Sequence, residues 1–161
     1  NQFKVYITFP TAMNTSQGLG AQELMYVCRA ASVPLCAIQN AQLMYRGRQV
    51  NFAGERVFQP WIATFYLDVD QRARIRFEEW SEYIREMDAT NGTIIHENYY
   101  GSLEVIPMDR NDNPMRSYKL FDVYPANISP ITLNYEANNM VAQFDVEFQY
   151  NYFTFEDVTS R

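Results

Sequence analysis

His96 is the only histidine in the chain and the first candidate for catalytic chemistry. A histidine side chain titrates near neutral pH and is the usual general base of enzymes. His96 lies between Asn91-Gly92 and an expected strand, and the sequence has no GxSxG motif that would supply a nucleophile for it. We therefore interpret His96 as a loop residue and predict no catalytic residue. An enzyme whose turnover depends on His96 is kept as a competing hypothesis.

The acidic residues contain two partial cation-binding patterns. Oxygen-bearing side chains alternate over residues 109–113, as in the first half of an EF-hand loop, but Pro114 occupies the required glycine position and Leu120 the bidentate glutamate position. Asp68 and Asp70 precede an expected helix, where the helix dipole favours acidic side chains. A hairpin turn and a helix cap explain these residues, and glycine-rich phosphate loops are absent from the sequence. We therefore predict no metal and no cofactor.

The composition predicts a β-rich domain. Aromatic residues make up 16% of the 161 residues, with 12 Tyr and 11 Phe, and flat rings pack well on pleated sheets. A chain of this length buries roughly 70% of its unfolded surface, and no linker or repeat divides it, so we expect a single domain over residues 1–161. The net charge of -6 argues against a firm grip on the phosphates of nucleic acid.

The cysteines and the apolar segments indicate in which cellular compartment the protein is expected. Cys28 and Cys36 do not form a CxxC pair, so two reduced, packed thiols and a cytosolic origin are expected. No window approaches the roughly 20 apolar residues that span a bilayer, and no signal peptide is recognised, so we expect a soluble protein that is not exported. The chain opens at Asn1 rather than at methionine, and an upstream segment is expected to be missing.

Alternation of apolar and polar residues predicts the strands, because successive side chains of a strand point to opposite faces. The final strand has the clearest pattern, with apolar residues at even positions from 140 to 152 and polar or acidic residues at most odd ones. Residues 11–20 read as a flexible loop. The expected strands cover residues 3–9, 23–31, 42–50, 57–67, 100–108, 115–124 and 140–152.

One long helix is predicted over residues 68–89. Asp68 and Gln71 have the spacing of a capping box, and Asn91-Gly92 supplies the stop. Apolar residues recur at steps of four and three, so one stripe should pack on a sheet. That stripe consists of Ala73, Phe77, Trp80, Ile84 and Met87, while Arg72, Arg76, Glu79, Glu82 and Glu86 are expected to face elsewhere.

The predicted elements leave a surplus of apolar surface. Residues 57–67 are apolar on both faces, and a strand of this kind needs cover on two sides. Copies of the same chain could supply the cover, or a second sheet of one chain could do so, as in a sandwich. The pattern alone does not separate these two alternatives.

Three stretches, in this order along the chain, resemble the tail tube proteins of long-tailed phages, especially those with contractile tails. The most specific is GRQVNFAGERVFQPWIATFYLDVDQRARIRFEEW, residues 47–80, with its Gly54-Glu55-Arg56 triplet, its aromatic-rich strand, and a helix containing Phe77 and Trp80. NISPITLNYEANNMVAQFDVEFQYNYF, residues 127–153, is similar to the closing strands of that family, and NQFKVYITF, residues 1–9, to its first strand.

The resemblance implies a mainly β fold, an antiparallel β-sandwich or barrel with one flanking α-helix. It implies hexameric rings that stack into a hollow tube, a virion tail assembled in the host cytoplasm, and no enzymatic activity. Implied partners are further copies of the chain and the tail sheath, baseplate, terminator and tape-measure proteins, with DNA only in transit and no membrane. The tube of a headless contractile injection device, such as a bacteriocin or a type VI secretion system, is the alternative, followed by a small-ligand-binding barrel.

The resemblance also suggests two functional regions. Residues 46–58 would form an extended loop that contacts neighbouring subunits or rings, through Arg46, Arg48, Asn51, Gly54, Glu55 and Arg56. A channel that passes DNA should have polar or acidic walls, because cationic walls would retain phosphates. The candidates for that wall are Gln143, Asp145, Glu147 and Gln149.

Overall fold

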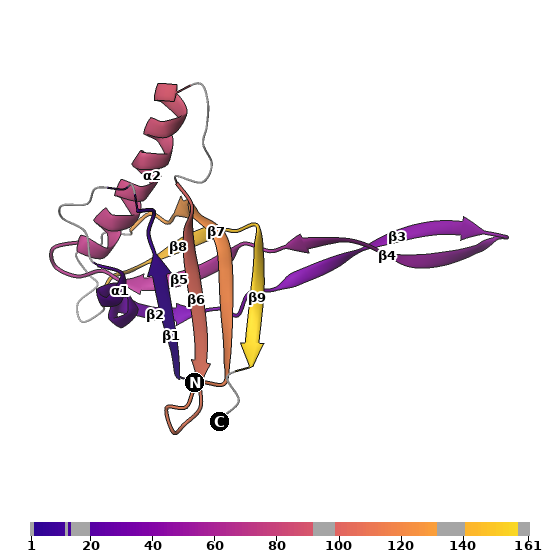
Figure 1. Ribbon diagram of the computed structural model, residues 1–161, viewed down its shortest axis with the longest axis horizontal. Coiled ribbons are helices and arrows are strands. Elements are labelled where there is room, and N and C mark those ends of the chain that lie inside the picture. The colour runs from indigo at the N-terminus through magenta and orange to yellow at the C-terminus, as the bar shows by residue number, and fades with distance from the viewer. Residues whose placement is uncertain (1, 12, 14–19, 92–98, 132–140, 158–161) are drawn as a thin grey trace.

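The computed structural model describes residues 2–11, 13, 20–91, 99–131 and 141–157 (Figure 1). In this part of the chain most elements are antiparallel strands, as the sequence predicts. The elements are β1 (Gln2–Thr8), α1 (Ala21–Val27), β2 (Cys28–Ala31), β3 (Cys36–Tyr45), β4 (Arg48–Phe58), β5 (Trp61–Tyr66), α2 (Arg72–Asn91), β6 (Gly101–Met108), β7 (Arg116–Ile128), β8 (Gln143–Gln149) and β9 (Tyr152–Asp157).

The strands of the body form two sheets that share β7. Sheet A has the order β1-β6-β7-β9, and sheet B has the order β7-β8-β5-β2. The first part of β7 pairs with β6 and β9, and its last residues pair with β8. A strand that passes from one sheet to the other makes the corner of an orthogonal sandwich or barrel.

The corner is built by matching irregularities in two neighbouring segments. In β7, Phe121 and Asp122 together face Ser102 of β6, and Asp122 has a left-handed φ of 55°. Alongside, Asn151 separates β8 from β9, and its side-chain amide donates to Asp122 Oδ2 at 3.0 Å. The prediction of one uninterrupted strand over residues 140–152 is therefore wrong, because the path along β7 bends where it changes sheets.

Aromatic side chains fill the space between the sheets and α2. Phe77 of α2 lies with its ring centroid 4.9 Å from that of Phe65 and 5.7 Å from that of Phe148. Ala73, Phe77 and Trp80 are fully buried. Ile84 packs against the same core and Met87 is half-buried. The buried strand residues include Val5, Ile7, Trp61, Ala63, Leu103, Leu120, Phe144 and Val146.

Arg76 lies inside this core, although a charged side chain was expected to face away from the apolar stripe of the helix. Its guanidinium carbon is 4.1 Å from the centroid of the Phe9 ring, and its Nη1 is 3.9 Å from Glu79 Oε2. A planar guanidinium can stack on an aromatic face, so an arginine next to Phe9 is accommodated where a polar residue was not expected.

Both helix starts differ from the sequence-based expectation. Residues 23–31 were expected to form one strand, but α1 occupies Ala21–Val27 and β2 only Cys28–Ala31. Glu23 Oε2 accepts a hydrogen bond from Gly20 N at 3.0 Å, and this cap favours the helix. Helix α2 begins at Arg72, because Gln71 has a left-handed φ of 53° and its N–H donates to the Asp68 carbonyl in a turn. The Asp68 capping box is therefore not formed.

The hairpin β3–β4 projects far from the body (Figure 1). Its turn is Arg46-Gly47, with φ values of 50° and 76°, as a two-residue type I′ hairpin turn requires. The expected strand boundaries were wrong here, since Val57 and Phe58 close the hairpin and the chain passes Pro60 before β5 begins at Trp61. Within β5, Trp61, Ala63 and Phe65 are buried while the other face is more exposed.

Candidate functional site

The projecting hairpin is the first candidate surface. Its strands pair from Cys36 opposite Phe58 at the base to Tyr45 opposite Arg48 at the tip. Every residue from 37 to 56 is exposed. A lone two-stranded hairpin is at best marginally stable in water, because it has no second layer on which to bury a face. An extended hairpin of this length is therefore expected to have a binding partner.

The Gly54-Glu55-Arg56 triplet lies within β4, although residues 46–58 were expected to form an extended loop. The pairing register shifts between Ile38 and Asn40, so that Gly54 and Glu55 both face the single residue Gln39, which defines a β-bulge. A Cβ on Gly54 would lie 2.8 Å from the Gln39 carbonyl oxygen. The glycine is required by this close approach of the two backbones.

The hairpin has one apolar face, which the sequence analysis missed. Side chains directly opposite on two antiparallel strands lie on the same face. The pairs Ala41–Phe52, Leu43–Val50 and Tyr45–Arg48 therefore share one side, called here the apolar hairpin face. Leu43, Tyr45, Val50 and Phe52 are 57%, 58%, 36% and 54% exposed.

The opposite hairpin face is more polar, although the exposed side chains of Ile38 and Met44 also lie on it. Asn40, Gln42, Gln49 and Asn51 lie on it, and Gln49 Nε2 donates to Asn51 Oδ1 at 3.4 Å. Of the residues predicted to contact other subunits, Arg48 lies on the apolar hairpin face, Asn51 on the polar face, and Arg46 in the turn. The sequence signal was the alternation of apolar residues on both sides of Arg46-Gly47.

The outer face of sheet B is the second candidate surface. Gln143, Asp145, Glu147 and Gln149 alternate with the buried Phe144, Val146 and Phe148, so the structure brings the four predicted lumen candidates together. Asp145 Oδ1 accepts a hydrogen bond from the Thr64 hydroxyl at 2.6 Å. Arg29 of β2 donates to Gln143 Oε1. These contacts lie on a partly acidic surface across β2, β5 and β8, on which Ile62 and Tyr66 of β5 are also exposed, opposite Glu147 and Gln143.

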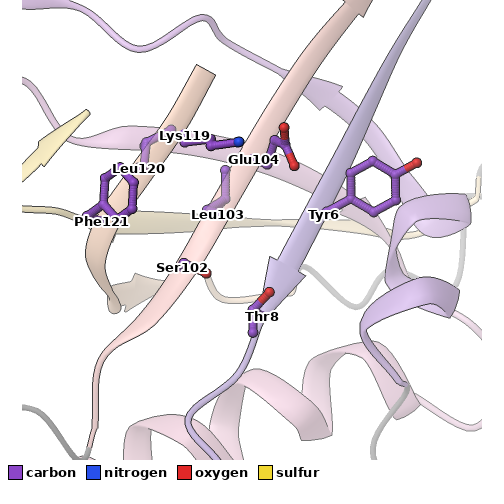
Figure 2. A pocket seen from close by; sticks show the side chains of 8 residues that line it. All are labelled: Tyr6, Thr8, Ser102, Leu103, Glu104, Lys119, Leu120 and Phe121. Atoms are coloured by element: carbon purple, nitrogen blue, oxygen red, sulfur yellow. The ribbon is translucent and has the colours of Figure 1, made fainter. Parts of the chain in front are cut away.

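The outer face of sheet A carries a shallow depression of about 180 Å³, shown in Figure 2. It lies where β7 bends out of sheet A, and side chains of β1, β6 and β7 line it. The Phe121 ring stacks on that of Tyr152 of β9, with centroids 4.8 Å apart and planes at 15°. The lining residues are Tyr6, Thr8, Ser102, Leu103, Glu104, Lys119, Leu120 and Phe121.

The residues first considered for chemistry do not form a site in the described part of the chain. His96 lies outside the described residues, and no group of three or more His, Cys, Asp or Glu side chains within them could hold a metal ion. Residues 109–113 form the predicted turn, in which Asp109 N donates to the Asn113 carbonyl at 2.9 Å. Cys28 and Cys36 are free thiols, and burial raises the pKa of Cys28 to about 12.

Within the described ranges, no helix combines the length and the apolar character that a membrane span requires.

Comparison with known proteins identifies relatives along almost the whole chain. The family described as phage tail tube protein matches residues 1–156. A tail tube protein of Serratia phage KSP90 is 24% identical over 153 residues, which cover 93% of this chain and 84% of the relative.

Solved structures share the fold. A chain in the sixfold-symmetrised baseplate of the anti-feeding prophage has a TM-score of 0.68 at 12% identity, covering 99% of this chain and 95% of that one. A chain in the extended sheath–tube complex of an extracellular contractile injection system, PVC, has a TM-score of 0.59 at 6% identity, covering 96% and 89%.

Proposed function

This chain belongs to the phage tail tube protein family, and we propose that its copies self-assemble into stacked hexameric rings that form a hollow conduit for DNA. Family membership makes it a structural tail component and not an enzyme. The observation that carries the assembly proposal is the β3–β4 hairpin, which is long, exposed along residues 37–56, and apolar on one face. A surface of this kind is stabilised by contact with another protein surface.

Sixfold rings are supported by the fold. A chain of the same fold occurs in a baseplate of sixfold symmetry. Interfaces between unlike surfaces of identical subunits generate rings when the rotation closes. The hairpin and the strand edges of the two sheets are unlike surfaces of one molecule, and they suit contacts within a ring and between stacked rings.

The outer face of sheet B is proposed to line the channel. Asp145 and Glu147 give this face its acidic character. The guanidinium of Arg29 donates a hydrogen bond to Gln143 Oε1 on the same face. An acidic wall repels phosphate, so DNA would pass without being bound. The remaining proposed partners are the sheath, baseplate, terminator and tape-measure proteins of a virion tail assembled in the host cytoplasm. Chains of this fold are found with a sheath and a baseplate.

A second candidate is the inner tube of a headless contractile injection system. The fold similarity to the anti-feeding prophage and PVC chains favours it, whereas the match to a phage tail tube protein favours the DNA conduit. Electron microscopy of particles from producing cells separates the two. A DNA-filled head on particles containing this chain supports the phage tail, and sheathed particles without heads support the injection device.

Assembly is tested by electron microscopy of the purified chain and of a variant with a shortened hairpin. Ile38 and Arg56 are direct cross-strand partners, so residues 39–55 can be replaced by Asn-Gly to close the hairpin at that pair. We expect sixfold rings and tubes from the unaltered chain and a folded monomer from the variant. Unaltered protein that stays monomeric at high concentration, or a variant that assembles equally well, would contradict the proposal.

A further inference from the structure

We propose that the apolar hairpin face docks onto the outer face of sheet A of a neighbouring copy, over the depression in Figure 2. This inference rests on the proposed self-assembly. It adds which surface of the neighbouring copy binds the hairpin and which face of the hairpin is bound. Four separate properties of the described residues support it: apolar surface, aromatic content, charge and position.

The apolar hairpin face is left uncovered by the described residues of its own molecule. Leu43, Tyr45 and Phe52 are each more than half exposed, and the hairpin points away from both sheets (Figure 1). Contiguous exposed apolar surface of this kind marks an interaction site in a soluble protein. The receiving surface should therefore be flat and rich in aromatic or aliphatic groups.

The outer face of sheet A offers aromatic rings beside polar side chains. Tyr6 is 36% exposed and Tyr152 45% exposed, and Tyr152 stacks on Phe121, which lines the depression. The depression lies beside the bulge in β7, between β1 and β7, and forms an open bed and not a closed cavity. A bed of this shape suits a strand face better than it suits a small molecule, because small-molecule sites are concave and bury most of their ligand.

Charge makes the two surfaces complementary. Arg48 is the cation on the apolar hairpin face, and among the described residues no acidic side chain pairs with it. Glu104 lines the depression and accepts a hydrogen bond from the Ser117 hydroxyl, but no cation of the described residues forms an ion pair with it. The nearby Lys119 lies 3.7 Å from Glu156. Lys119 is the direct cross-strand partner of Glu104, but the ion pair that it forms is with Glu156, so the Glu104 carboxylate can accept Arg48 of a neighbouring copy.

The position of the hairpin relative to sheet A allows this contact between copies. The hairpin projects past β9, and β1 lies at the opposite edge of sheet A (Figure 1). In a head-to-tail arrangement, the hairpin of one copy therefore approaches the β1 side of the next, where the depression begins. The 10 residues of β3 extend about 33 Å, enough to cross four strands spaced about 4.8 Å apart.

A charge exchange tests the contact. We expect Arg48→Glu and Glu104→Arg each to reduce the fraction of protein in tubes roughly tenfold, and the double variant to recover most of it, because the exchange restores an opposite-charge pair. Arg56→Glu combined with Glu104→Arg is the matched control. Arg56 pairs with Ile38 on the other hairpin face, so this combination should not recover assembly.

A photo-cross-linking residue at position 43 or 52 provides a second measurement that does not depend on tolerance of charge reversal. In assembled tubes, we expect cross-linked peptides from β1, β6 or β7 of a second copy. Tubes whose cross-links fall on sheet B, on α2 or on a different protein, together with a double variant that is not rescued, would overturn this inference alone. Unaltered protein that forms no tubes would overturn the proposed function as well.

Discussion

The indole ring of Trp80 occupies the space beside Gly101, so that a Cβ added at Gly101 would lie 2.8 Å from Trp80 Cη2 and would also clash with the Thr8 carbonyl oxygen. The ring is fixed in this place by its Nε1, which donates to the Tyr99 carbonyl at 2.9 Å. Helix α2 is thereby joined to the start of β6 at a point where no side chain other than hydrogen fits. Placement of the helix over the core depends on this glycine.

We expect Gly101→Ala to lower the free energy of unfolding by about 1–3 kcal/mol, because overpacking of a close-packed interior forces side chains or backbone to shift. Thermal and urea unfolding followed by circular dichroism measure the effect. Gly20→Ala is the control, since the nearest atom to its added Cβ is 3.8 Å away, and the expected loss is below about 1 kcal/mol. Equal stability of the Gly101 variant and the unaltered chain would show that the body relaxes around the added methyl group.

Gly54→Val should alter the hairpin and leave the body intact. The added side chain would clash with the Gln39 backbone at the bulge, whereas the buried core lies outside the hairpin. We expect a melting temperature near that of the unaltered chain and a large loss of tubes in negative-stain images. Ala53→Val, one residue earlier and opposite Asn40 in the regular ladder, is the matched control and should assemble. Normal tubes from the Gly54 variant would show that the bulge has no part in assembly.

Replacement of Asp145 and Glu147 by arginine should make assembled tubes retain DNA. If these side chains line the channel, cationic groups there would neutralise phosphates and bind DNA with a strong dependence on salt. Fluorescence anisotropy of labelled DNA with tubes, measured against salt concentration, tests this. The same two changes at Glu78 and Glu82, which are exposed on α2, control for net charge. Equal retention by both double variants would exclude a special role of sheet B in the channel wall.

The Cys28 thiol should make stability depend on pH in the alkaline range. Burial raises the pKa of Cys28 from 9.0 to about 12, so the folded chain keeps a proton that the unfolded chain loses. The free energy of unfolding therefore falls as the pH rises from about 9 towards 12. We expect the melting temperature of the reduced, unaltered chain to decline more steeply over pH 8–10.5 than that of Cys28→Ala. Cys36→Ala controls for removal of a thiol, and parallel curves for the unaltered chain and Cys28→Ala would contradict the assignment.

The periodicity of apolar residues correctly predicted several strands and the buried face of the long helix. The expected strands at residues 3–9, 100–108 and 115–124 lie within two residues of β1, β6 and the start of β7. The stripe of Ala73, Phe77 and Trp80 points into the core because a helix face with this spacing is continuous. A pattern of two or of 3.6 residues is a property of the chain itself, so it can be read before any partner is known.

Short segments were misread where the pattern is ambiguous. The segment 23–31 is too short for its apolar pattern to distinguish an amphipathic helix from a strand. The hydrogen bond between Gly20 N and the Glu23 side chain favours the helix. Arg76 has the spacing of a core residue but a polar type, and only its stacking on Phe9 explains its burial. Residues 46–58 were expected to form an extended loop, because the bulge at Gly54 breaks the alternation of the strand.

By itself, the sequence determined a mainly β chain of acidic charge, the apolar stripe of its long helix, and the resemblance that leads to a tail tube family. Only the tertiary structure decided that β7 belongs to both sheets, that Gly54 lies in a bulge, and that the hairpin extends into solvent with one apolar side. The physical reason is that strand pairing, sheet corners and exposure depend on residues far apart in the chain. Composition and periodicity describe each segment alone, whereas these features are properties of the contacts between segments.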